Sequence, residues 1–125
     1  MRRTVTLAAA AALALAGCGG GSGGGKTVTV GKGKPLVVKA DEYEFDPGNI
    51  VLKGGGFVRI QLTNDGAQAH DLHVRKDGAD LGGTPVFGPG QSKKTTVKLA
   101  PGEYEYVCTV GDHEAQGMKG TLTVT

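Results

Sequence analysis

One stretch near the C-terminus brings three metal-binding side-chain types together at regular spacing. Cys108, His113 and Met118 follow the pattern C-x4-H-x4-M. A thiolate, an imidazole and a thioether are soft or borderline ligands, which suit copper far better than calcium or magnesium. Zinc would usually take a further Cys, His or carboxylate in place of the methionine. The spacing therefore predicts a copper-binding loop over residues 108–118.

Copper requires one more strong ligand, and two upstream histidines compete for that position. His70 is in step with the apolar Leu72 and Val74, whereas His73 is in step with the charged Asp71. Successive side chains of a strand point to opposite faces, so parity selects His70 as the inward ligand. His73, like Asp71, is expected to face outward, and its default role is that of a solvated surface residue.

Each of these side chains also has a purely structural explanation. A lone cysteine at a strand end is often a small buried hydrophobe, and a lone methionine often fills a gap in a core. The combination of regular spacing, an upstream histidine in phase and a cysteine without a disulfide partner favours a metal site instead. Cys108 is in phase with Tyr104 and Tyr106 and is expected at the inner end of its strand.

The elements that must position these ligands read as β-strands. From Lys26 onward apolar and polar residues alternate, a period of two that is typical of strands with one buried face. Turn-forming residues separate the strands, and no window carries a helical pattern. The expected inward positions are Tyr43, Phe45, Val58, Ile60, Leu62, Leu72, Val74, Val97, Leu99, Tyr104, Tyr106, Leu122 and Val124. This pattern predicts one all-β domain over residues 26–125, a two-sheet Greek-key β-sandwich, with most of residues 76–91 in a loop.

The N-terminal residues read as a targeting segment. Two arginines precede an apolar run over residues 5–16, which is shorter than the roughly 20 residues that span a bilayer and is typical of a secretory signal peptide. The small residues before Cys18 resemble the lipobox of bacterial lipoproteins, although an ordinary signal peptide with a chance cysteine has the same outline. Residues 1–17 are thus predicted to be a lipoprotein signal peptide, Cys18 the lipidated residue, and residues 18–25 a Gly-rich tether.

Length and charge exclude several classes of protein. The chain has 125 residues, enough for one domain, and carries 14 basic and 12 acidic residues. Removal of residues 1–17 takes away Arg2 and Arg3 and leaves 12 of each sign. This balance argues against a nucleic-acid-binding protein, which needs a concentrated basic surface. Lipidation of Cys18 would also leave Cys108 without a disulfide partner.

With these residues the chain resembles the small bacterial blue-copper proteins of the cupredoxin family, of the plastocyanin-like kind. The resemblance lies in residues 42–47, 64–70, 102–108 and 113–124. It implies a cupredoxin-like fold and one copper ion that cycles between Cu(I) and Cu(II). His70, Cys108 and His113 would be the trigonal ligands and Met118 the weak axial ligand. It also implies that the ring edge of His113 lies near the surface, where electrons would leave.

The resemblance extends to the residues behind the ligands, with two departures. The family commonly has Asn after its first histidine, bonded to the Ser or Thr after the cysteine; here Asp71 and Thr109 stand at those positions. An ionised carboxylate can only accept, so the bridge is expected to differ or to run from the Thr109 hydroxyl to Asp71. Gly111-Asp112 stands where relatives often have Pro-Gly, which predicts a softer loop.

The function implied is that of a membrane-tethered one-electron carrier outside the cytoplasm, monomeric, with a redox donor and acceptor as partners. An enzyme is not expected, because the chain shows no spare ligand set beyond His73. Two other functions stay open. A copper-trafficking or storage lipoprotein would usually carry Met-rich or His-rich tracts, which are absent from the sequence. A metal-free interaction module would tolerate the loss of Cys108.

Overall fold

A computed structural model describes residues 25–125, so the predicted signal peptide, the lipidation at Cys18 and most of the tether lie outside the described residues. Ten strands follow one another along the described chain. They are β1 (Thr27–Val30), β2 (Leu36–Asp41), β3 (Glu44–Asp46), β4 (Asn49–Leu52), β5 (Gly56–Asn64), β6 (His73–Lys76), β7 (Ala79–Gly83), β8 (Ser92–Leu99), β9 (Gly102–Val107) and β10 (Lys119–Val124). None of the described residues forms a helix with the length and apolar character needed to cross a membrane.

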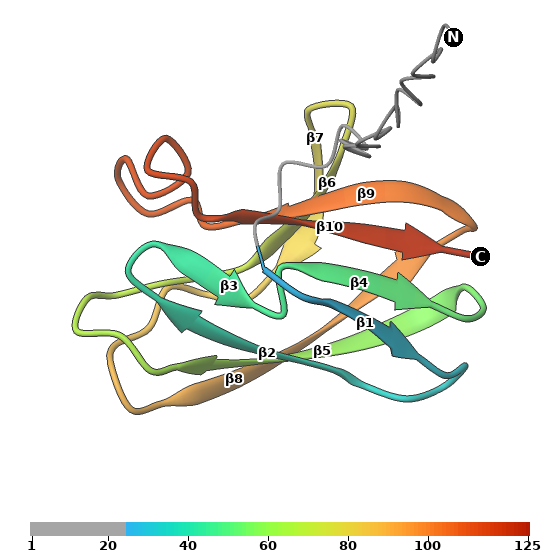
Figure 1. Ribbon diagram of the computed structural model, residues 1–125, viewed down its shortest axis with the longest axis horizontal. Coiled ribbons are helices and arrows are strands. Elements are labelled where there is room, and N and C mark those ends of the chain that lie inside the picture. The colour runs from blue at the N-terminus through green and yellow to red at the C-terminus, as the bar shows by residue number, and fades with distance from the viewer. Residues whose placement is uncertain (1–24) are drawn as a thin grey trace, which may run out of the picture.

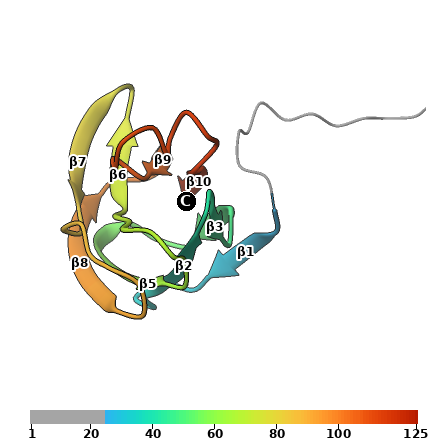
Figure 2. The ribbon, with the colours of Figure 1, turned by 90° about the vertical axis from the view of Figure 1, so that its left-hand side faces the viewer.

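The strands form two sheets that pack face to face. One sheet has six strands in the order β1-β4-β10-β9-β6-β7, and the other has four in the order β3-β2-β5-β8. Figure 1 shows the two layers along the strands, and Figure 2 shows them from the end where the loop between β9 and β10 lies. Most partners within a sheet are distant in sequence; β4, for example, runs parallel to both β1 and β10. The prediction of an all-β two-sheet fold is confirmed.

The core lies between the sheets and is formed by the inward face of each strand. All the predicted inward positions are buried except Tyr43, which is half-buried because it lies in the turn before β3. Strands β2 and β4, which the sequence pattern did not single out, contribute further buried side chains. Every strand and every core residue of the described chain lies between Thr27 and Val124. Residues 25–125 therefore contain all the side chains that form this core.

The prediction that residues 76–91 are mostly loop is wrong for residues 79–83, which form β7. Lys76 pairs with Ala79, so β6 and β7 make a hairpin with a two-residue turn. Asp77 and Gly78 adopt positive φ values of 49° and 81°. An Asp-Gly pair is well suited to the turns that connect two strands in this way, and that local signal outweighs the polar composition of the segment.

Gly120 allows β10 to pass close to the aromatic ring of Tyr106. The two residues are paired across the β9–β10 ladder, and the Tyr106 hydroxyl donates to the Pro47 carbonyl at 2.5 Å. A Cβ added at Gly120 would lie 2.3 Å from Tyr106 Cζ and 2.6 Å from the Gly48 carbonyl oxygen. The backbone of β10 therefore leaves no room for a side chain at this position.

We expect Gly120→Ala to lower the free energy of unfolding by about 1–3 kcal/mol, as overpacking does in a dense core. Urea unfolding of the metal-free protein measures the change. Gly88→Ala is the matched control, because the nearest atom to a Cβ there is 3.7 Å away and belongs to the Gln91 side chain. Equal stability of the two variants would contradict the expected crowding.

Candidate metal centre

Three ligand side chains meet at one end of the sandwich. The ligand atoms of His70, Cys108 and His113 all lie within 4.8 Å of one another, and all three residues are buried. Cys108 Sγ is 3.9 Å from His70 Nδ1 and 3.5 Å from His113 Nδ1. The structure thus brings together the two histidines and the cysteine that sequence parity and spacing selected.

Two parts of the fold hold these three residues. Cys108 follows directly after β9, and His113 lies in the loop between β9 and β10. His70 precedes β6 and forms a β-bridge with Phe87, in which each backbone N–H donates to the other residue's carbonyl at 3.1 and 3.0 Å. A distant segment and a ligand loop therefore fix the site from two sides.

The loop of residues 108–118 is closed by its own backbone hydrogen bonds. The Cys108 N–H donates to the Met118 carbonyl at 3.2 Å, and the Met118 N–H donates to the His113 carbonyl at 3.0 Å. His113 N–H in turn donates to the Val110 carbonyl at 3.0 Å. Met118 is fully buried. These bonds tie the three predicted loop ligands together. They do so although Gly111-Asp112 stands where relatives often have Pro-Gly, the departure that predicted a softer loop.

The donor atoms fit a soft or borderline metal cation. Both imidazoles turn Nδ1 toward the Cys108 sulfur, and the other nitrogen of each ring is bonded to a protein oxygen: His70 Nε2 to Glu42 Oε1 and His113 Nε2 to Gln68 Oε1, each at 2.9 Å. An oxygen partner on one ring nitrogen leaves the other free to bind metal, an arrangement that is general among metal-binding histidines. Burial raises the pKa of the Cys108 thiol, so a bound cation is what would favour its thiolate.

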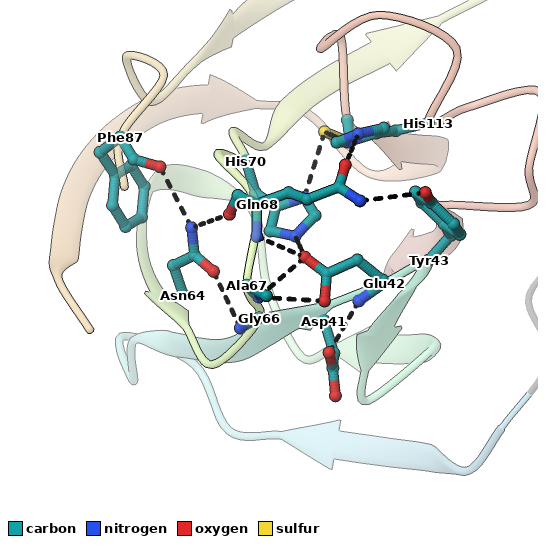
Figure 3. A network of polar contacts seen from close by, with 11 residues as sticks. Asp41, Glu42, Tyr43, Asn64, Gly66, Ala67, Gln68, His70, Phe87 and His113 are labelled. Carbon is teal, nitrogen blue, oxygen red and sulfur yellow. Dashed lines mark hydrogen bonds and ion pairs between the residues drawn. The ribbon is translucent and has the colours of Figure 1, made fainter. Parts of the chain in front are cut away.

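Glu42 holds the loop that precedes His70. Its Oε1 accepts from the Gln68 N–H at 2.7 Å and from His70 Nε2, and both carboxylate oxygens lie 3.0–3.1 Å from the Ala67 N–H (Figure 3). These donors, the Ala67 N–H first among them, lower the pKa of Glu42 to about 2. At Gly66, a Cβ would lie 2.5 Å from Glu42 Oε1, so glycine permits the close approach.

Asp71 and Thr109 form the bridge behind the ligands. The Thr109 N–H donates to Asp71 Oδ1 at 2.6 Å, and the Thr109 hydroxyl donates to Asp71 Oδ2. The expectation that Asp71 faces outward is wrong, since its exposed fraction is 1%. Strand β6 begins only at His73, so the alternation of strand faces does not extend to Asp71.

His73 is not simply solvated. Its side chain is 25% exposed; Nδ1 lies 2.7 Å from Asp80 Oδ2 and Nε2 lies 3.4 Å from Asp71 Oδ2. Asp80 belongs to β7, the strand that the sequence analysis placed in a loop. His73 therefore links the outer hairpin to the buried carboxylate of Asp71 and is not among the residues whose ligand atoms converge.

The resemblance implies that the ring edge of His113 lies near the surface; the ring is buried, and the exposed residue Gln68 covers that edge. His113 is 5% exposed, and the Tyr43 ring lies over it at a centroid distance of 5.1 Å. The Gln68 side chain occupies the outer edge, at Nε2. Of the two acidic residues that flank His113, Glu114 forms an ion pair with Arg75 at 2.8 Å, so its charge is compensated.

Glu42, Gln68 and Tyr43 are parts of the site that neither strand periodicity nor motif spacing predicts. Glu42 lies 28 positions from His70, and Gln68 lies 45 positions from His113. Both residues lie outside strands, where a period of two carries no information about side-chain direction. Gly66 permits the close approach of Glu42, but one glycine among 23 does not by itself point to this contact.

The sequence and the fold are similar to those of known proteins. The sequence matches the cupredoxin-like domain family over residues 6–124. It is 48% identical over 82 residues to Auracyanin-B of Chloroflexus aurantiacus, a match that covers 62% of this chain and 35% of that protein, so the chain spans about a third of this curated relative.

Two solved structures share the fold. Auracyanin A, a "blue" copper protein from Chloroflexus aurantiacus, superposes with a TM-score of 0.62 at 21% identity, covering 80% of this chain and 100% of the other. A Cu-containing nitrite reductase from Thermus scotoductus superposes with a TM-score of 0.56 at 21% identity, covering 79% of this chain and 28% of that enzyme.

Proposed function

The chain belongs to the family of cupredoxin-like domains, and from this premise we propose that it binds one copper ion and carries single electrons outside the cytoplasm. The observation that carries the proposal is the buried convergence of two imidazole nitrogens on one thiol, at 3.5 and 3.9 Å. A thiolate with two imidazoles is the donor set that suits a one-electron copper site.

The chain's own residues have distinct tasks in this proposal. His70, Cys108 and His113 would bind the ion strongly, with Met118 as a weak ligand from the same loop. When bound, copper supplies a one-electron couple between Cu(II) and Cu(I). Glu42 orients His70 through Nε2, and the sandwich core keeps water from the ligands. A site held in place by the fold moves little when its charge changes, which favours fast transfer.

The same proposal includes a place and partners. Lipidation of Cys18 would hold the domain at a bacterial membrane through the Gly-rich residues 18–25, and a redox donor and an acceptor would meet the monomeric domain there. We do not assign an enzymatic reaction. The part of this chain that superposes on the nitrite reductase covers 28% of that enzyme, so the reaction of the whole enzyme is not carried over.

Absorption spectroscopy tests the copper proposal. Cu(II) is added to residues 26–125, and the visible spectrum is recorded before and after a reductant. An intense blue or green band that bleaches and returns reversibly supports the electron carrier. Bound copper with only weak colour favours the alternative of copper trafficking or storage. Folded protein that binds no copper would exclude both and leave a metal-free interaction module.

The charge of Asp112 should lower the reduction potential of the site. Asp112 is exposed, lies next to His113, and accepts from the Gln116 side chain at 3.2 Å. A negative charge near copper stabilises Cu(II), so Asp112→Asn is expected to raise the potential. The rise should not exceed about 40 mV, because exposed charges interact by at most about 1 kcal/mol and a tenfold change equals about 59 mV for one electron.

Voltammetry at neutral pH measures the effect of Asp112→Asn. Asp77→Asn is the matched control, because Asp77 is an equally exposed aspartate in the β6–β7 turn, where asparagine tolerates the positive φ of 49°. The same shift in both variants, or none in Asp112→Asn, would remove the role given to Asp112.

A further inference from the structure

We propose that Gln68 is a positioning residue for His113. Its amide oxygen accepts the Nε2 hydrogen, which fixes the tautomer that presents an unprotonated Nδ1 to Cys108 Sγ, and its side chain covers the ring edge that a redox partner would approach. The inference deepens the proposed function and rests on it for the role of the metal. A partner that docks over the site would therefore contact Gln68 before His113.

Gln68 is exposed, yet each of its polar groups has a partner (Figure 3). Its N–H donates to Glu42 at 2.7 Å, and its carbonyl accepts from Asn64 Nδ2 at 2.9 Å. Its side-chain Nε2 donates to the Tyr43 hydroxyl at 3.1 Å, and Oε1 lies 2.9 Å from His113 Nε2. An exposed glutamine side chain loses substantial rotamer entropy when it is held at both ends of its amide, so the contacts with Tyr43 and His113 indicate a specific position.

The direction of the Gln68 amide determines the protonation of His113. In the structure the NH2 group of Gln68 lies against the Tyr43 hydroxyl and the amide oxygen lies against His113 Nε2. A carbonyl oxygen can only accept, so Nε2 carries the hydrogen and Nδ1 carries the lone pair. That Nδ1 lies 3.5 Å from Cys108 Sγ. The hydrogen bond from His113 Nε2 to Gln68 thus determines that Nδ1 of the same ring is the nitrogen available for metal binding.

The backbone around Gln68 ties this contact to the other histidine. Asn64 is fully buried and donates both to the Gln68 carbonyl and, at 3.1 Å, to the Phe87 carbonyl. Phe87 forms the β-bridge with His70. The segment of residues 64–70 therefore contains one histidine, His70, and contacts the other, His113, through the Gln68 side chain.

Nitrogen-15 NMR of metal-free residues 25–125 tests the tautomer. The chain has three histidines, so the ring signals can be assigned by single substitutions. We expect the neutral ring of His113 to carry its hydrogen on Nε2 alone. Gln68→Ala should give a mixture of tautomers, whereas Gln68→Glu keeps an acceptor and should preserve the single form. Gln116→Ala is the control, because Gln116 is an exposed glutamine that bonds Asp112 and not His113.

Copper affinity provides the second measurement. Gln68→Ala should weaken Cu(II) binding by roughly 10–100-fold, the usual effect of removing a partner of a ligating histidine, and Gln116→Ala should leave it unchanged. Wild-type His113 protonated at Nδ1, or Gln68→Ala with unaltered tautomer and affinity, would overturn the inference. The NMR measurement is made without metal. It therefore tests the role of Gln68 even if the protein does not bind copper.

Discussion

Cys108→Ser is expected to abolish the intense visible absorption of the copper-loaded protein while the sandwich stays folded. The band requires a copper–thiolate bond, and a serine hydroxyl at neutral pH supplies no thiolate. Cys108 is fully buried directly after β9, so the smaller oxygen replaces sulfur without steric conflict. Burying a hydroxyl should lower the free energy of unfolding by about 1–3 kcal/mol, which a domain of this size tolerates.

The other cysteine of the chain provides the control for this prediction. Cys18 lies outside the residues that the structure describes and is not among the predicted copper ligands, so Cys18→Ser in a chain that retains it should leave the band unchanged. Absorption of equal intensity in Cys108→Ser and wild type would show that the colour does not come from this thiolate. In that case His70 and His113 would bind copper without the ligand that makes one-electron transfer efficient.

The sequence was most informative where strands are regular. The period of two placed Ile60, Leu62 and Val74 in the core, because one face of each strand is buried and the alternation continues from residue to residue. It also placed His70 and Cys108 on the inner side, although both lie just beyond strand ends. The C-x4-H-x4-M spacing then identified the loop that closes the site.

The sequence failed where the chain leaves its strands. Asp71 was placed outside by parity, yet it turns inward because Thr109 offers two donors to its carboxylate. Glu42 and Gln68 lie in turns, and their contacts join segments that no local pattern relates. Polar residues that support a site are thus set by tertiary contacts, whereas the ligands themselves were identified by residue type and spacing.

Glu42→Gln is expected to weaken copper binding and to change how stability depends on pH. The carboxylate accepts from the N–H groups of Ala67 and Gln68 and from His70 Nε2. An amide keeps one acceptor oxygen but loses the charge and the second acceptor. Removal of a carboxylate behind a ligating histidine should reduce the affinity for Cu(II) by roughly 10–100-fold. A titration of wild type and variant with copper measures this.

The free energy of unfolding of the metal-free protein, measured at decreasing pH, tests the same Glu42 carboxylate. The pKa of Glu42 is lowered from 4.5 to about 2 in the folded protein, so its contribution is present above pH 4.5 and is lost as the pH falls toward 2. Wild-type metal-free protein should therefore lose stability across that interval, and Glu42→Gln should lose less. Glu44→Gln is the matched control, because Glu44 is exposed on β3 and makes no ion pair within residues 25–125. If Glu42→Gln kept the acid dependence of wild type, the hydrogen bonds from Ala67, Gln68 and His70 would not lower the pKa of Glu42 in the folded protein.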